Sequence, residues 1–252
     1  MKSLIIIPTY DERENVQPIA AAILQVAPSV NILFVDDNSP DGTGKIVDAM
    51  CAGNPQIHVI HKEGKQGLGR AYITGFKWAL SNGYDLIFEM DADFSHNPKE
   101  IPNFIKAAEE ADLIIGSRYI KGIRIMNWPM SRLLLSKTAA TYVKIITGMP
   151  VFDPTGGFKC FRREVLENIQ LDSILSNGYA FQAELNYNTW LAGFRIKEIP
   201  IVFEDRHQGY SKMTKGIAKE ALYIMLRLAI RHNFRRTPHP RPTPVTRPQT
   251  QD

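Results

Sequence analysis

The chain has 252 residues and a formal net charge of +4, with 44% apolar and 10% aromatic side chains. This length and composition can fill a large hydrophobic core, which excludes wholesale disorder, collagen and small disulfide scaffolds. The two cysteines, Cys51 and Cys160, lie far apart and outside any CxxC pattern, so we expect no disulfide framework or zinc knuckle and a reducing, cytoplasmic environment. No apolar run is long enough for a signal peptide or a membrane span.

The basic residues gather toward the C-terminus. Nine of the 30 bases but only two of the 26 acids lie in residues 212–252, so the rest of the chain is slightly acidic. These bases follow an apolar helical pattern rather than an aromatic and basic sheet surface. The pattern therefore favours an anionic membrane surface over nucleic acid as a partner.

Short apolar runs alternate with helical patterns along the first part of the chain. This alternation is typical of an α/β protein with one mostly parallel sheet flanked by helices. We expect strands over 4–7, 31–35, 57–61, 85–90 and 112–116. We expect helices over 19–26, 44–52, 69–81 and 98–110.

Residues 120–160 break this alternation and predict a loop-and-helix insertion. The pattern then resumes with a helix, a strand and a basic helix over 180–192, 195–202 and 215–232. The last residues hold five prolines and almost no apolar side chains, which predicts a disordered tail. We therefore expect a single domain, an amphipathic C-terminal helix and a basic Pro-rich tail, over 1–215, 216–234 and 235–252.

Polar residues follow four of the expected strands. In an open parallel sheet, ligands bind outside the carboxyl ends of the strands. A helix cap or a turn could explain any one of these segments, but four together indicate a site. The segments are 8–12, 36–39, 91–93 and 116–119.

The segment Asp91-Ala92-Asp93 places two carboxylates directly after an apolar strand. Carboxylate oxygens suit Mg²⁺ or Mn²⁺ carrying a diphosphate, because these metals complete their shells with water and phosphate oxygens. A lone DxD triplet is common on loops. Its position after a buried strand favours a metal site.

With these and further motifs, the sequence resembles glycosyltransferase family 2, whose members have the GT-A fold. Within that family it is similar to the dolichyl-phosphate (polyprenyl-phosphate) mannose synthases. The continuation Ser95-His96, the pair Asn127-Trp128 and the pair Arg206 and Lys212 carry the likeness to this subgroup. The widely shared motifs are 8–15, 35–43, 67–72 and the DxD triplet 91–93, and the segments 116–119 and 153–158 also carry the resemblance.

The resemblance implies roles for individual residues. Five residues would line the guanosine pocket: Pro8, Tyr10, Glu12, Val35 and Asp37. Asp91 and Asp93 would hold the metal, with Ala92 at the nucleotide sugar and Ser95 or a water as third ligand, where family members often have Gln. Three bases would clamp the phosphates and, with both aspartates, form the catalytic set: Arg118, Arg206 and Lys212. The acceptor phosphate and lipid would contact Arg118, Arg132, Ser136 and Trp128.

The same resemblance implies transfer of mannose from GDP-mannose to a polyprenyl phosphate in one inverting displacement. An acceptor phosphate with a second pKa of about 6 is largely ionised at neutral pH and brings its own nucleophile. A dedicated base is then unnecessary. We expect Asp153 and Glu184 to position the sugar or nearby loops instead.

Residues 120–150 mix apolar, aromatic and basic side chains, as a lipid acceptor at a bilayer surface would require. Leu133 to Leu135 taken alone favour a packed helix hairpin. We expect the protein to lie peripherally on the cytoplasmic face of a membrane, held by its basic tail or by a separate anchor protein. The six histidines show no ligand spacing, and most are expected in loops or at the surface.

Two alternatives remain open. The first is another donor on the same fold, such as UDP-glucose, which competition between GDP and UDP would distinguish. The second is a non-catalytic protein that binds nucleotide sugars or tethers to membranes. That protein would have lost a DxD carboxylate or a phosphate clamp, and all of these residues are present here.

Overall fold

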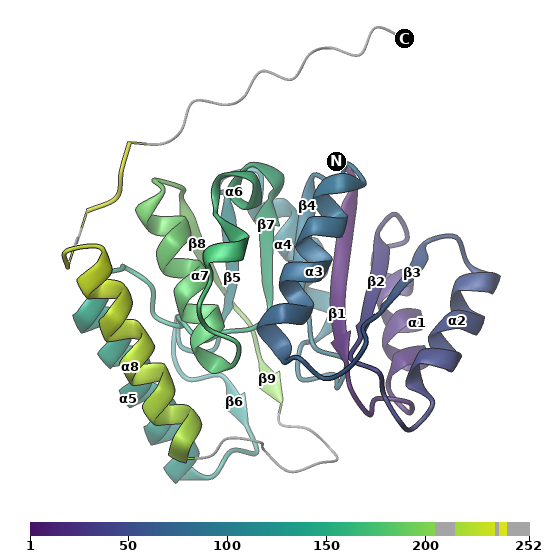
Figure 1. The fold of residues 1–252 in the computed structure, drawn as a ribbon, viewed down its shortest axis with the longest axis horizontal. Helices are drawn as coiled ribbons and strands as arrows, with labels where there is room; N and C mark the ends of the chain where they lie inside the picture. The colour runs from purple at the N-terminus through teal and green to yellow at the C-terminus, as the bar shows by residue number, and fades with distance from the viewer. Residues whose placement is uncertain (205–214, 235–236, 241–252) are drawn as a thin grey trace, which may run out of the picture.

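The computed structural model describes residues 1–204, 215–234 and 237–240. Its centre is a seven-stranded sheet of order β3-β2-β1-β4-β7-β5-β8, with helices on both faces (Figure 1). The strands are β1 (Ser3–Thr9), β2 (Asn31–Asp36), β3 (Ile57–His61), β4 (Leu86–Glu89), β5 (Leu113–Ser117), β7 (Lys159–Arg162) and β8 (Ile196–Pro200). The expected α/β class is confirmed.

One group of helices covers each face of the sheet. The first group is α1 (Val16–Val26), α2 (Thr43–Gly53) and α4 (Ile101–Ala107), which follows the short helix η1 (Pro98–Glu100). The opposite group is α3 (Leu68–Ser81), α6 (Arg163–Asn168), η2 (Leu171–Ser173) and α7 (Tyr179–Leu191). Both faces are covered, so the central strands are apolar on both sides. Ile5 and Ile7 pack into one core, and Leu4 and Ile6 pack into the other.

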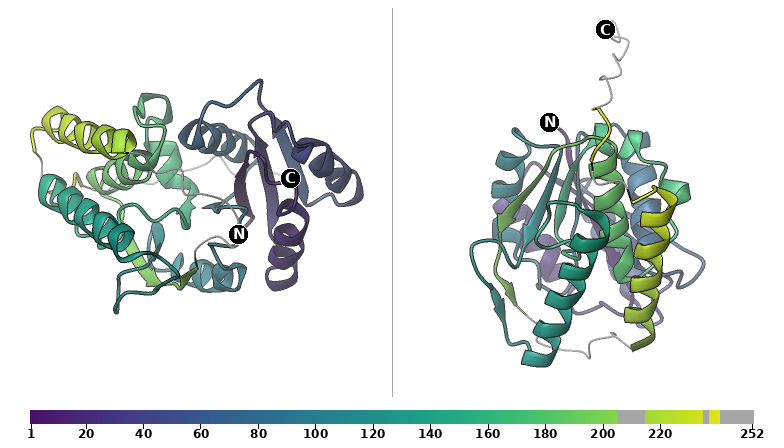
Figure 2. Two further views of the ribbon diagram at one scale, coloured as in Figure 1. Left: turned by 90° about the horizontal axis from the view of Figure 1, so that it is seen from below. Right: turned by 90° about the vertical axis from the view of Figure 1, so that its left-hand side faces the viewer.

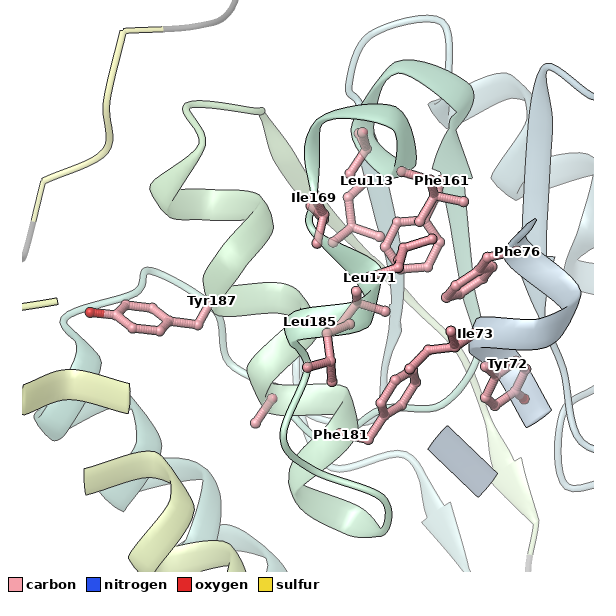
Figure 3. Close-up of a cluster of buried hydrophobic side chains, with 14 of the residues drawn as sticks. Tyr72, Ile73, Phe76, Leu113, Phe161, Ile169, Leu171, Phe181, Leu185 and Tyr187 are labelled. Carbon is pink, nitrogen blue, oxygen red and sulfur yellow. The ribbon is translucent and has the colours of Figure 1, made fainter. Parts of the chain in front are cut away.

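The core that contains Leu4 and Ile6 joins segments that are far apart in the sequence. Ile73 and Phe76 of α3 face Phe161 of β7, and Phe181 and Leu185 of α7 close the cluster (Figure 3). Phe76 and Phe161 meet edge to face with ring centroids 5.6 Å apart. These contacts hold α3 and α7 over the middle of the sheet.

The strand β7 corrects the expectation that 120–160 is only loop and helix. It inserts antiparallel between β4 and β5, with Lys159 opposite Glu89. The same segment contains β6 (Ile125–Met126), which pairs with β9 (Phe203–Glu204), and the helix α5 (Met130–Thr147). A four-residue strand that begins with lysine carries no apolar run, so only its pairing in the sheet defines it.

A further helix, α8 (Lys215–Arg231), packs against α7 and α5 and lies outside the sheet layers (Figures 1 and 2). Its bounds agree with the predicted basic helix. Most of the predicted tail lies outside the described residues. Within the described part of the chain, no helix combines the length and the apolarity needed to cross a membrane.

Candidate active site

The carboxyl ends of β1 and β2 are bound together at one edge of the sheet (Figure 1). The hydroxyl of Thr9 donates to Asp36 Oδ1 at 3.0 Å, and the backbone N–H of Asp37 donates to the Thr9 carbonyl at 3.0 Å. Both hydrogen bonds form because Thr9 and Asp36 are register partners in the parallel pair of strands. They place the first two predicted motifs side by side.

Asp37 is buried and already has partners. Lys62 Nζ donates to Oδ1 at 2.7 Å, and the backbone N–H groups of Gln66 and Gly67 donate to Oδ2 at 3.3 Å each. Asp37 therefore also organises the loop that leads into α3. The ring of Tyr10 lies at the same edge, with Lys65 Nζ 3.6 Å from its centroid.

The other predicted nucleotide residues differ in exposure. Pro8, Tyr10 and Glu12 are partly exposed, as a pocket lining requires. The side chains of Val35 and Ala92 are buried in the two cores. If these two residues contact a nucleotide sugar, their backbone atoms make the contact.

The DxD loop leaves β4 at the same edge. Asp91 and Asp93 are partly exposed, and Asp93 Oδ1 accepts the Ser95 N–H at 3.1 Å. Phe94, which lies between Asp93 and Ser95, has a φ of 63°, a left-handed conformation that costs a bulky residue energy. Such strain is concentrated at functional sites.

The donor atoms of this loop fit a hard divalent cation. No three His, Cys, Asp or Glu side chains of the described residues group closely enough to hold a metal by themselves. The two carboxylates are oxygen ligands, and the Ser95 hydroxyl is buried without a hydrogen-bond partner among the described residues. A Mg²⁺ or Mn²⁺ site would take its other ligands from water and diphosphate.

His96 lies in this loop, as expected for most of the histidines, but its side chain is only 2% exposed. Its Nδ1 accepts the backbone N–H of Asp91 at 3.0 Å. The only sequence signal for this contact was its place in the Ser95-His96 continuation of the DxD motif.

Arg118 is joined to Asp153 by two parallel hydrogen bonds. Its Nε donates to Oδ2 and its Nη2 to Oδ1, both at 2.7 Å, and its backbone N–H also reaches Oδ2 at 2.9 Å. Burial would raise the pKa of Asp153, but the Arg118 charge and its hydrogen bonds hold that pKa below its usual value. The carboxylate is thus a weak base that orients Arg118.

Glu198 of β8 extends this arrangement. Its carboxylate accepts the backbone N–H groups of Phe152 and Asp153 at 2.8 and 2.9 Å. Burial raises the pKa of Glu198. Sequence reasoning did not identify this residue, which lies in a strand remote from every motif.

The four predicted acceptor residues lie in one cluster of basic and aromatic side chains. The guanidinium of Arg118 is 5.5 Å from the ring of Trp128, and that of Arg132 is 4.1 Å from the same ring. The Tyr119 hydroxyl donates to Ser136 Oγ at 2.7 Å. The other two predicted phosphate clamps, Arg206 and Lys212, lie outside the described residues.

Glu184 of α7 is buried and shapes a loop. Its carboxylate accepts the backbone N–H groups of Leu175 and Ser176 at 3.0 and 2.9 Å. Asn177 in this loop then accepts the Arg70 N–H at 3.1 Å at the start of α3. The contacts agree with a positioning role for Glu184.

A second buried ion pair lies behind the DxD loop. Glu89 of β4 and Lys159 of β7 are fully buried, with Lys159 Nζ 3.9 Å from Glu89 Oε2. Burial raises the pKa of Glu89 to about 7 against the attraction of Lys159, and lowers the pKa of Lys159 to about 8. Lys159 also donates to the Gln182 carbonyl at 3.1 Å.

The family described as Glycosyl transferase family 2 matches residues 4–170. The chain belongs to glycosyltransferase family 2.

Two relatives in this family span nearly the whole chain. The polyprenol monophosphomannose synthase of Mycolicibacterium smegmatis is 45% identical over 91% of this chain and 88% of its own. The undecaprenyl-phosphate mannosyltransferase of Micrococcus luteus is 44% identical over 90% of this chain and 93% of its own.

A solved glycosyltransferase has the same architecture. The mannosyltransferase of Pyrobaculum calidifontis, in complex with GDP-Man and Mn²⁺, superposes with a TM-score of 0.57 at 16% identity. The match covers 91% of this chain and 70% of that one. The expected GT-A fold is therefore confirmed.

Proposed function

We propose that this enzyme transfers mannose from GDP-mannose to a polyprenyl phosphate with inversion at the anomeric carbon. The names of the mycobacterial and Micrococcus relatives support the sugar and the class of acceptor. The observation that carries the proposal is that the DxD loop lies next to the Arg118, Trp128 and Arg132 cluster, because Phe203 contacts both His96 of the loop and Arg118 and Trp128 of the cluster. This arrangement offers separate places for a diphosphate and for a second anionic reactant.

The donor side of the proposal uses the strand-end carboxylates. Asp91 and Asp93 would hold Mg²⁺ or Mn²⁺, with the Ser95 hydroxyl or a water beside them. Such a metal supplies charge neutralisation for the departing diphosphate. The Pyrobaculum neighbour, which binds GDP-Man and Mn²⁺, supports this assignment.

The acceptor side uses the basic and aromatic cluster. Arg118 and Arg132 would bind the acceptor phosphate, Ser136 would hydrogen-bond to it, and Trp128 would contact the lipid. An ionised phosphate oxygen forms a bond to the anomeric carbon while the bond between that carbon and the GDP oxygen breaks. GDP leaves with both electrons of the broken bond. Arg206 and Lys212 stay predictions for the same anionic reactants.

Asp153→Asn should lower mannosyl transfer by about tenfold without abolishing it, because the amide weakens the hold on Arg118 but removes no base. Initial rates between pH 6 and 9 provide the measurement. The pH profile should keep its shape. Complete loss of turnover in a folded variant that still binds GDP would contradict a positioning role.

The membrane is proposed to bind the face formed by α5 and α8. These helices expose apolar side chains at helical spacing, beside exposed bases such as Lys137 and Arg227. Leu134 and Leu135 are 66% and 45% exposed, so these two leucines do not pack into the core, although α5 itself packs against α8. The exposed set is Met130, Leu134, Leu135, Ile145, Tyr223, Leu226 and Ile230.

The double variant Leu134→Glu/Ile230→Glu should lower binding to vesicles of phosphatidylglycerol and phosphatidylcholine by about tenfold or more, because both apolar side chains become charged. Co-sedimentation measures the bound fraction. Leu175→Glu changes an equally apolar side chain, 40% exposed outside these helices, and should bind like the wild type. Equal binding of all three proteins would contradict this surface. The cytoplasmic face and a separate anchor protein stay predictions.

The function is tested by the transfer of labelled mannose from GDP-mannose to a short polyprenyl phosphate, in the presence of Mg²⁺ or Mn²⁺. Label in the lipid phase, with the β-configured product expected from inversion, would support the proposal. Product from UDP-glucose but none from GDP-mannose would replace the donor. Binding of nucleotide sugars without transfer from any donor would favour the non-catalytic alternative.

A further inference from the structure

His96 is a buried polar residue that the proposed reaction does not use directly. Its Nδ1 accepts the backbone N–H of Asp91, and its Nε2 lies 3.9 Å from Asp91 Oδ2. Because an N–H group only donates, Nδ1 carries the lone pair, and the proton of the neutral ring is on Nε2. One imidazole thus faces both the backbone and the carboxylate of Asp91.

Aromatic residues from distant parts of the chain hold this ring in place. It stacks on Phe158 with centroids 5.1 Å apart and planes 18° apart, and it meets Phe203 of β9 edge to face at 6.0 Å. A Cβ at Gly157 would lie 3.3 Å from His96 Cε1, so the backbone approaches the ring closely there. The orientation of His96 is therefore set by packing before any ligand binds.

Phe203 also contacts the basic cluster. Its ring is 5.5 Å from the Arg118 guanidinium and meets Trp128 edge to face at 5.5 Å. The same side chain therefore touches His96 and the proposed acceptor site. The DxD loop and the acceptor cluster share one packed support.

We propose that His96 is a positioning residue that holds Asp91 in the conformation needed for metal binding. This inference rests on the proposed metal-dependent function. A ligand that is fixed in advance loses less conformational freedom on binding, and partners of this kind contribute strongly to metal affinity. His96 is buried and acts through Asp91, whose backbone N–H and carboxylate both lie beside its ring.

Three substitutions separate the hydrogen bond from the packing. His96→Asn keeps an acceptor oxygen near the position of Nδ1, His96→Gln moves the amide one bond farther out, and His96→Leu removes the acceptor. The readout is Mn²⁺ binding in the presence of GDP, followed by the paramagnetic resonance signal of free Mn²⁺. The Gln and Leu variants should bind Mn²⁺ about 10- to 100-fold more weakly, whereas the Asn variant should stay within about threefold of the wild type.

The melting temperature of each variant accompanies the titration. Asn and Gln bury the same amide group, so their comparison stands even if the Leu variant does not fold. Equal Mn²⁺ affinities for the Asn and Gln variants would overturn the inference.

The wild type and Asp93→Ala separate this inference from the function it rests on. If the wild type binds Mn²⁺ no better than Asp93→Ala, the metal site itself is wrong and the inference is overturned with it. If wild-type binding depends on Asp93 but all three His96 variants bind normally, only the positioning role is overturned.

Discussion

Asp93→Ala should lower metal-dependent mannosyl transfer by about 100- to 1,000-fold. The substitution removes one of the two DxD carboxylates, and with it a proposed ligand of the metal that would offset charge on the departing diphosphate. Asp93 lies in a loop and is partly exposed, so its loss should leave the core intact. Label from GDP-mannose recovered in the lipid phase, at saturating Mn²⁺, measures the effect.

The matched control for this variant is Asp172→Ala. Asp172 belongs to the short helix η2, and its side chain is 81% exposed and, among the described residues, is paired with the exposed Lys77. Its transfer rate should equal that of the wild type. A rate for Asp93→Ala within about threefold of the wild type would contradict the assignment of the DxD loop to the metal and the diphosphate.

Lys159→Met should destabilise the protein by about 3–5 kcal/mol, because it leaves the Glu89 carboxylate buried without its cation. For a domain of this size, this corresponds to a fall in Tm of about 6–20 °C. Thermal unfolding followed by circular dichroism gives the value. The fold should survive, because methionine fills a similar volume in the sheet.

Two further variants separate charge burial from the loss of a lysine. Lys197→Met removes a lysine of β8 that pairs with Glu110 at the surface, and its Tm should stay close to that of the wild type because solvent screens an exposed pair. Glu89→Gln/Lys159→Met removes both buried charges and should recover much of the lost stability. An unchanged Tm for Lys159→Met alone would show that Glu89 needs no buried cation.

Most of the edge that carries the site could be predicted from local patterns. The apolar runs before Pro8, Asp36, Asp91 and Gly116 predicted strands, and the structure contains a strand at each. The polar groups after them were predicted to meet because parallel strands end at one edge. Arg118, Trp128, Arg132 and Ser136 do lie in one cluster, but their roles stay predictions.

Other features could not be read from local patterns. His96 is buried against Phe158 and Phe203, and the residues next to His96 in the sequence do not indicate either contact. The pair Glu89 and Lys159 exists only because β7 enters the sheet antiparallel beside β4. A charged residue in a strand signals that it has a partner but does not say which one.

The sequence by itself therefore determined the α/β class, the edge of the sheet at which the candidate site residues meet, and the resemblance to glycosyltransferase family 2. Burial periodicity and turn chemistry are local properties, and each expected strand displayed them in a few consecutive residues. Only the tertiary structure decided the insertion of β7, the orientation of Arg118 by Asp153 and the support of Asp91 by His96. These depend on contacts between segments far apart in the chain, whose pairing follows from packing of the whole domain.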